Sequence, residues 1–204
     1  MHWIEAKPSV NNNNNKYLLF CLFKLFMIKL PKDSLFIISN FIINNKEIYF
    51  FEKGITIIDN KNFMYCESLV KVEIPDSVVS IKTCTFYDCV NLREIIIPDS
   101  VISIGNNAFW NCANLREIII PDSVISIGSH AFYNCENLRE IIIPILVTKI
   151  GKSSFGYCKN LTKLSIPSSI TNIGKHAFDY CENLNNITFY NSETSIEISS
   201  NILK

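Results

Sequence analysis

The sequence predicts an α/β repeat solenoid, because several residue types recur with one period of 23 residues. Cysteine, phenylalanine, leucine and isoleucine each keep this spacing over six copies. The recurring positions are Cys66, Cys89, Cys112, Cys135, Cys158 and Cys181; Phe63, Phe86, Phe109, Phe132, Phe155 and Phe178; Leu69, Leu92, Leu115, Leu138, Leu161 and Leu184; and Ile58, Ile81, Ile104, Ile127, Ile150 and Ile173. The run REIIIPDSVISIG at 93–105 returns letter for letter at 116–128. Each period is therefore one structural unit stacked on the next.

The first half of each repeat predicts a short strand. In the unit 91–113, a β-branched run favours extended backbone, with Ile95 and Ile97 on one face. Pro98 ends the strand because proline has no backbone N–H to donate. The residues at 99–100, Asp and Ser, then favour a turn.

The second half of the repeat predicts a return by a shorter extended piece and a tight turn. Residues 101–104 alternate apolar and polar side chains only in part, which indicates a second, shorter extended piece. Gly105 permits a sharp bend. Ala108, Phe109 and Cys112 are spaced i, i+1 and i+4, which predicts one helical or 3₁₀ turn that points Phe109 inward.

The composition indicates one solenoid domain with two atypical ends. Hydrophobic residues make up 48% of the 204 residues, too many for a disordered chain. One repeat cannot fold alone, because its few buried side chains do not offset the entropy of ordering its backbone. We therefore expect a leader with a capping helix and a hairpin at 1–53, a solenoid of about six repeats at 54–190, and a C-terminal cap or tail at 191–204.

The leader contains one strongly apolar stretch at 17–30. It is shorter than the roughly 20 apolar residues of a membrane span, and Lys24 interrupts it, so membrane insertion is not expected. A signal peptide would need a small-residue cleavage site, which is missing. We expect a capping helix here, followed by a hairpin at 41–51. The run from Leu30 faintly resembles an F-box, but the rest of that helical motif is absent.

The cysteines do not predict a metal site or a disulfide framework. Metal ligands cluster at short spacing, whereas the six periodic cysteines lie on different repeats, and an even ladder favours no particular pairing. We expect these six thiols to be buried and reduced. Cys84 lies at a variable, exposed position of the repeat, where it is either a reactive thiol or an idle surface residue. The same position holds Asn107, His130, Ser153 and His176.

The sequence shows no catalytic constellation. His130 and His176 lie two repeats apart, roughly 10 Å, too far for one metal ion or a proton relay. No nucleophile–base pair, glycine-rich phosphate loop or carboxylate pair stands out. We therefore expect a protein that is not an enzyme and that uses no cofactor and no metal. Sequons at Asn160 and Asn186 are weak evidence for secretion.

The repeat as a whole resembles the BspA-like class of leucine-rich repeats. The shared pattern, L-x-x-I-x-I-P-x-S-V-x-x-I-G-x-x-A-F-x-x-C-x-N-L at 92–115, extends over about residues 54–190. The resemblance implies a right-handed solenoid with a parallel sheet along one face, and a role in adhesion or protein recognition, often at the surface of microbes and protozoan parasites. Lys82 in place of glycine, the Ile-Leu pair at 145–146 in place of Asp-Ser, and Tyr190 in place of proline depart from the pattern.

Two exposed rows are the candidate partner-binding sites. If Ile95 and Ile97 point inward, the alternate residues of each strand must point outward. These outward residues are Glu94, Glu117 and Glu140 beside Ile96, Ile119 and Ile142. The second row consists of Tyr87, Trp110 and Tyr133. The alternatives are that the isoleucines are present only for their strand propensity and bind nothing, and that the aromatic residues shield the edge of the core.

The sequence thus favours a non-catalytic protein-binding or adhesion module; the alternative is a structural scaffold or an intracellular adaptor. An apolar stripe lined with acids suits a protein partner with a basic, hydrophobic segment. Lysine plus arginine equals aspartate plus glutamate at 19 each, so no net field attracts nucleic acid or an anionic membrane. The family resemblance implies a cell-surface location, whereas the sequence itself allows the cytoplasm equally.

Overall fold

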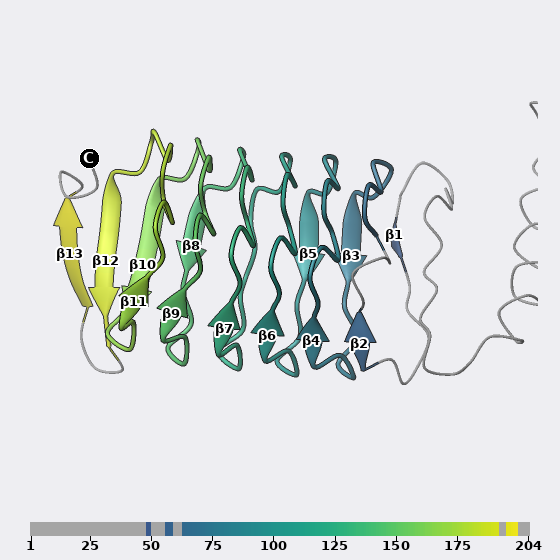
Figure 1. The fold of residues 1–204 in the computed structure, drawn as a ribbon, viewed down its shortest axis with the longest axis horizontal. Coiled ribbons are helices and arrows are strands. Elements are labelled where there is room, and N and C mark those ends of the chain that lie inside the picture. Colours follow the sequence, from purple (N-terminus) through teal and green to yellow (C-terminus); the bar gives the residue numbers. More distant parts are fainter. Residues whose placement is uncertain (1–47, 50–55, 59–62, 192–194, 200–204) are drawn as a thin grey trace, which may run out of the picture. The chain divides into compact units, whose positions relative to one another are not determined.

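The computed structural model describes residues 48–49, 56–58, 63–191 and 195–199. The chain divides into two compact units, 1–36 and 37–204, and every described residue lies in the second. The described residues form a solenoid of short parallel strands, with one coil per repeat (Figure 1).

The longer strands lie on one face of the solenoid, in two sheets. The three-stranded sheet contains β1 (Ile48–Tyr49), β3 (Lys71–Glu73) and β5 (Glu94–Ile96). The four-stranded sheet contains β8 (Glu140–Ile142), β10 (Lys163–Pro167), β12 (Asn186–Tyr190) and β13 (Ser195–Ser199). All neighbours within these sheets are parallel except β12 and β13, which pair antiparallel. The longer strands thus lie where the repeat pattern predicted them, at or directly before the recurring proline.

The opposite face is one continuous six-stranded parallel sheet of two-residue strands. Its members are β2 (Ile57–Ile58), β4 (Ser80–Ile81), β6 (Ser103–Ile104), β7 (Ser126–Ile127), β9 (Lys149–Ile150) and β11 (Asn172–Ile173). Neighbouring strands pair residues one period apart, as Ser103 does with Ser126. The expected shorter extended piece is therefore confirmed, and the register equals the sequence period.

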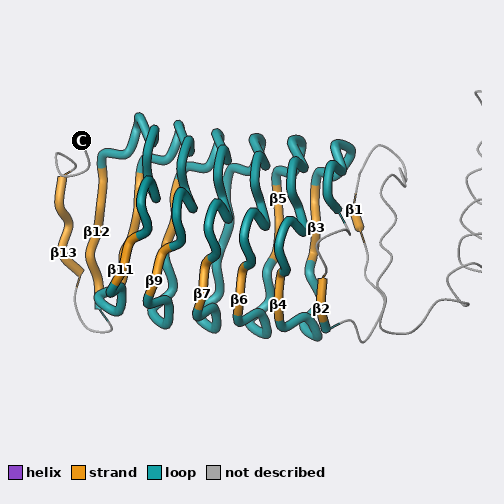
Figure 2. The backbone as a smooth tube through the Cα atoms, viewed as in Figure 1, coloured by secondary structure: helices purple, strands orange, loops and turns teal. Residues whose placement is uncertain are grey.

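The expected helical or 3₁₀ turn at 106–112 is wrong: the segment is a chain of turns, and the described residues contain no helix (Figure 2). Its amides alternate in direction. The Ala108 and Trp110 amides donate to carbonyls three residues back, whereas the Phe109 and Asn111 amides donate to the next repeat. Asn107 and Asn111 also have left-handed φ values of 54° and 56°. A helix cannot form when every second amide bonds to a neighbouring coil. The described part of the fold is therefore all-β and not α/β as predicted.

The predicted interior ladders form the core. The phenylalanine rings stack along the solenoid axis, with centroids 5.2 Å apart for Phe86 and Phe109 and 5.1 Å for Phe109 and Phe132. Both inward strand positions of the repeat are buried, as expected from Ile95 and Ile97. The last repeat is the exception, because no further coil of the described residues covers it: Ile173 is 46% exposed, and Phe178, Cys181 and Leu184 are only partly buried.

The recurring glycine serves close packing between coils and not a left-handed bend. No left-handed φ occurs at Gly105, Gly128 or Gly151. A Cβ at Gly105 would lie 2.6 Å from the backbone of Lys82, and one at Gly151 would lie 2.5 Å from the backbone of Gly128. A glycine is needed because the preceding coil leaves no room for a side chain.

The expected leader helix and most of the expected hairpin lie outside the described residues. Of the hairpin range 41–51, only Ile48 and Tyr49 are described, and they pair parallel with β3. Cys21 also lies outside the described part of the chain. Among the residues that the structure describes, no helix is long and apolar enough to cross a membrane.

Candidate binding surface on the parallel sheet

The outward positions of the longer strands carry the predicted isoleucine row. Ile96, Ile119 and Ile142 are 49%, 83% and 54% exposed, while the inward isoleucines on either side of each are buried. Strand alternation explains this arrangement, because consecutive side chains point to opposite faces. Three large apolar side chains in consecutive repeats therefore face solvent, the kind of surface that soluble monomers usually avoid.

Two acidic columns flank the isoleucine row. On one side lie Glu94, Glu117 and Glu140, all exposed. On the other side, at the turn that follows each strand, lie Asp76, Asp99 and Asp122, also exposed. The aspartates were not among the residues predicted for the site, although they recur with the same period. Glutamates thus lie beside all three isoleucines, and aspartates lie beside Ile96 and Ile119, whereas the corresponding position after Ile142 is Ile145.

Lysines at the ends of the glutamate column pair with the outer glutamates. Lys71 forms an ion pair with Glu94 of the following repeat, and the Lys163 Nζ lies 3.7 Å from the Glu140 Oε2. Glu117, at the centre, has no ion pair among the described residues. The charge available to a partner is therefore concentrated beside Ile119.

The arginines next to these glutamates in the sequence form no ion pair with them. Arg93, Arg116 and Arg139 are exposed, and no carboxylate of the described residues lies within 4.0 Å of them. They form a separate basic column on the glutamate side of the strands. At 93–99 and at 116–122, the surface therefore changes from basic to acidic, then apolar, then acidic again.

The central coil of this face is splayed from its neighbours. Residues 117–120 form no strand, which divides the face into two sheets, and they make no backbone–backbone hydrogen bond among the described residues. The inward Ile118 and Ile120 keep 8% and 7% exposure, close to the 6% and 8% of Ile95 and Ile97 in the preceding coil, whereas Ile141 and Ile143 in the following coil are fully buried. The splay coincides with the greatest exposure of the row, at Ile119.

The second predicted row is a stack of rings, and its members are half-buried. The Trp110 ring centroid lies 4.4 Å from that of Tyr87 and 6.1 Å from that of Tyr133, with interplanar angles of 5° and 8°. The stack continues through Tyr157 and Tyr180, which take the next position of their repeats. Because the rings cover one another's faces, only their edges remain for a partner. This packing agrees with the alternative that the row shields the edge of the core.

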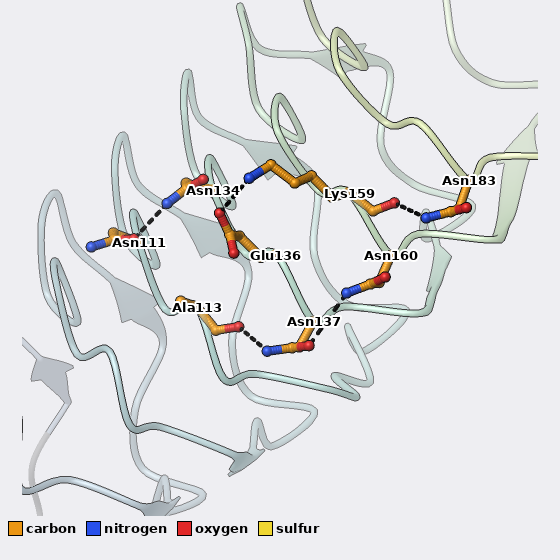
Figure 3. A network of polar contacts seen from close by, with 8 residues as sticks. All are labelled: Asn111, Ala113, Asn134, Glu136, Asn137, Lys159, Asn160 and Asn183. Atoms are coloured by element: carbon orange, nitrogen blue, oxygen red, sulfur yellow. Dashed lines mark hydrogen bonds and ion pairs between the residues drawn. The ribbon is translucent and has the colours of Figure 1, made fainter.

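Polar side chains join consecutive coils beside this stack (Figure 3). The Asn134 Nδ2 donates to the Asn111 Oδ1 at 2.6 Å, and the Asn137 Nδ2 donates to the Ala113 carbonyl at 2.9 Å. The Lys159 Nζ lies 2.8 Å from the Glu136 Oε1. These residues satisfy the backbone and side chains of the turns, so their role is structural. Their 23-residue spacing is the signal in the sequence that could have identified them.

The cysteine ladder is a set of buried thiols that bond to the backbone. The Cys112 Sγ donates to the Phe86 carbonyl at 3.2 Å, and the Cys135 Sγ donates to the Phe109 carbonyl at the same distance. Burial raises the pKa of the Cys112 thiol well above its ordinary value. Cys181 differs from the prediction because it is only partly buried, in the last repeat; burial raises its pKa to about 12.

The remaining titratable candidates do not assemble into a catalytic or metal site. Cys84 is partly exposed, and burial raises the pKa of its thiol. Burial, together with Lys152, lowers the pKa of His130, whose ring contacts that of Tyr133. The His176 Nδ1 lies 2.6 Å from the Asp179 Oδ2 on the surface. Among the described residues, no group of three His, Cys, Asp or Glu side chains could hold a metal ion.

Comparison with known proteins gives a consistent result. The profile of the BspA type leucine-rich repeat region matches in six copies, over residues 43–162 and 103–202. A crystal structure of a leucine-rich repeat protein from T. pallidum is 31% identical, with a TM-score of 0.65, and the match covers 68% of this chain and 64% of that one. A leucine-rich cell surface protein from Faecalibacterium prausnitzii is 32% identical, with a TM-score of 0.54, and the match covers 68% of this chain and 44% of that one.

A third similar structure, a leucine-rich repeat protein from Bacteroides ovatus, is 28% identical with a TM-score of 0.55. That match covers 65% of this chain and 40% of the other. The chain thus spans less than two thirds of the length of these structures. A search of curated proteins found no match.

Proposed function

Because the chain belongs to the BspA-type leucine-rich repeat family, we propose that it is a non-catalytic protein-binding module whose longer-stranded face binds a basic, hydrophobic segment of a partner protein. The observation that carries this proposal is the exposed isoleucine row of Ile96, Ile119 and Ile142, with the glutamate column beside all three and the aspartate column beside Ile96 and Ile119. Exposed apolar side chains gain from desolvation by a partner, and the acids select a partner with lysine or arginine beside its apolar residues.

Within this face, Ile119 is the proposed anchor. It is the most exposed isoleucine of the row, and the unpaired Glu117 lies two residues before it. Energetically important interface residues tend to be central and surrounded by contacts that exclude water. Ile96 and Ile142, in the adjoining repeats, supply such flanking contacts. The aromatic stack contributes stability in this proposal and not affinity.

The family relationship supports an adhesive role without specifying it. The F. prausnitzii relative is described as a cell surface protein. We propose a comparable surface role for this chain, in which the solenoid presents its acidic-apolar face to a protein of another cell or of the same surface.

The test uses a displayed library of random peptides selected on the full chain. We expect the recovered peptides to combine lysine or arginine with large apolar residues. Ile119→Lys should weaken their binding at least about tenfold, because hot-spot substitutions cost more than about 1–2 kcal/mol. High salt should weaken binding as well, since the acidic columns lie at the surface.

The matched control is Ile125→Lys. Ile125 is 52% exposed but lies beside β7 on the opposite face, so the same substitution should leave peptide binding unchanged. Equal losses from both variants, or peptides without basic residues, would contradict the proposed site.

A further inference from the structure

Among the described residues, the C-terminal end of the solenoid is covered on one face only. On the longer-stranded face, β13 pairs with β12 and adds one more strand. On the opposite face, the last strand is β11, and no strand of the described residues pairs with its outer edge (Figure 1). In the described part of the last coil, the interior is therefore covered on the side of β12 and uncovered on the side of β11.

Exposure of the ladder residues marks the same half. Ile81, Ile104 and Ile150 are at most 1% exposed, whereas Ile173, at the same position of the repeat, is 46% exposed. Beside Ile173 the structure has a hollow of about 380 Å³. Its apolar lining includes Ile166, Pro167, Ile170 and Phe189. The interior column thus continues to the surface with apolar side chains that nothing in the described residues covers.

Two backbone acceptors face this open end. In earlier repeats, the carbonyl of the ladder isoleucine accepts an amide from the next coil, as Ile150 does from Gly174 at 2.8 Å. The carbonyl two residues earlier does the same, as Thr148 does from Thr171 at 2.9 Å. Thr171 and Ile173 are the last members of these two series, and their carbonyls have no backbone donor in the described structure.

Three backbone donors at the turn face the same end. The amides of Ser153, Phe155 and Tyr157 each donate to the next coil at 2.8–3.0 Å. One period later, the amides of His176, Phe178 and Tyr180 have no acceptor within the described residues. The acceptors and the donors therefore trace the path that a further half-coil would take.

We propose that this end is an acceptor site for an extended segment of another protein chain that is built like half of one repeat. The segment would donate two amides to the Thr171 and Ile173 carbonyls and accept the three amides of the turn. It would also place a β-branched apolar residue on Ile173 and an aromatic residue on Phe178, as each coil of the solenoid does for the one before it. Backbone pairing supplies affinity in such strand addition, and the side-chain positions supply specificity.

The chain itself provides the probe. A peptide with the sequence of residues 101–111 has every required group in register. It would place Val101 against Ile170, Ile104 against Ile173 and Phe109 against Phe178. It omits Cys112, which prevents disulfide exchange. A labelled form would be titrated with the full chain and followed by fluorescence anisotropy. The control peptide carries Ile104→Asp and Phe109→Asp.

We expect the 101–111 peptide to bind and the control peptide to bind at least about tenfold more weakly, because both anchoring side chains are lost. Ile173→Lys in the chain should cause a similar loss, and its partly exposed position should allow the variant to fold. Ile119→Lys should leave peptide binding unchanged, which separates this site from the sheet face. Hydrogen exchange at the amides of His176, Phe178 and Tyr180 should be fast in the free chain and slow in the complex.

Three results would overturn the proposal. One is the absence of binding at millimolar peptide, and another is unaltered affinity of the Ile173→Lys variant. The third is slow exchange of the three amides in the free chain, because it would show that the chain covers this end itself.

Discussion

At the residue scale, the repeat requires left-handed backbone at two positions, and side chains other than glycine occupy both. One position holds Cys84, Asn107, His130, Ser153 and His176, with φ between 50° and 61°. The other holds Tyr65, Asp88, Asn111, Asn134, Tyr157 and Tyr180, with φ between 56° and 63°. Asparagine tolerates this conformation best among these residue types. The positions that the sequence shows as merely variable are therefore conformationally demanding.

This geometry makes Cys84→Asn a stabilising substitution. Asparagine at 84 should relieve part of the left-handed strain and match Asn107 in the next coil, raising the free energy of unfolding by about 0.5–1 kcal/mol. Urea denaturation measures the change. Thr83→Asn is the control, since Thr83 is exposed and has no left-handed φ. A gain from Thr83→Asn equal to that from Cys84→Asn would refute the conformational explanation.

The buried thiols make stability fall at alkaline pH. Burial raises the pKa of Cys112 and Cys135 above the value of about 8.5 that thiols have in an unfolded chain. The unfolded state therefore loses protons first as the pH rises. Stability from these thiols is fully present below about pH 8.5 and is lost above it, by about 1.4 kcal/mol per pH unit for each thiol.

Comparing pH profiles isolates one thiol of the ladder. The free energy of unfolding of Cys135→Ala would be measured between pH 8.5 and 10.5. It should decline less steeply than that of the original chain, by about 1.4 kcal/mol per pH unit. Tyrosines and lysines contribute equally to both profiles, so they cancel in the difference. Parallel profiles would mean that Cys135 ionises in the folded protein.

At the element scale, the sequence predicted what one repeat determines by itself. The period, the strand before proline, the inward Ile95 and the outward Ile96 all follow from residue spacing, and the structure shows them. The helical turn was wrong because the amides of Phe109 and Asn111 bond to the following repeat, a choice that the spacing within one repeat does not reveal. The open last coil was missed for the same reason: burial of Ile173 depends on a neighbour and not on its own repeat.

The phenylalanine ladder tests this dependence on neighbours. Phe109 stacks on a ring at each side and is fully buried, so Phe109→Ala should lower the free energy of unfolding by about 3–5 kcal/mol through the cavity it leaves. Phe178→Ala should cost clearly less, because Phe178 is partly exposed and, among the described residues, stacks on Phe155 alone. Urea denaturation of both variants measures the difference. Equal costs would show that the last coil is packed as tightly as the middle.

At the scale of the whole array, strand pairing is continuous along one face of the solenoid and interrupted along the other. The six-stranded sheet continues from β2 to β11, whereas the longer-stranded face divides between β5 and β8 at the coil of Ile119. The coils thus stay in register along one face while the other opens at the centre of the proposed binding site. Stability in such arrays is a sum of contributions from each repeat and each interface between neighbours. One coil can therefore lose pairing without loss of the fold.

Deleting residues 106–128 examines this modular character directly. Gly105 would then precede Ser129, as Gly128 does in the native chain, and the identical runs at 93–105 and 116–128 make the new junction native in sequence. We expect the shortened chain to fold and unfold cooperatively, with a smaller denaturant m-value, since less surface is exposed on unfolding. It would bring β5 and β8 together as neighbours and would lack Ile119. Peptides selected on the longer-stranded face should therefore bind it at least about tenfold more weakly. Undiminished binding by this folded deletion variant would show that Ile119 is not the anchor.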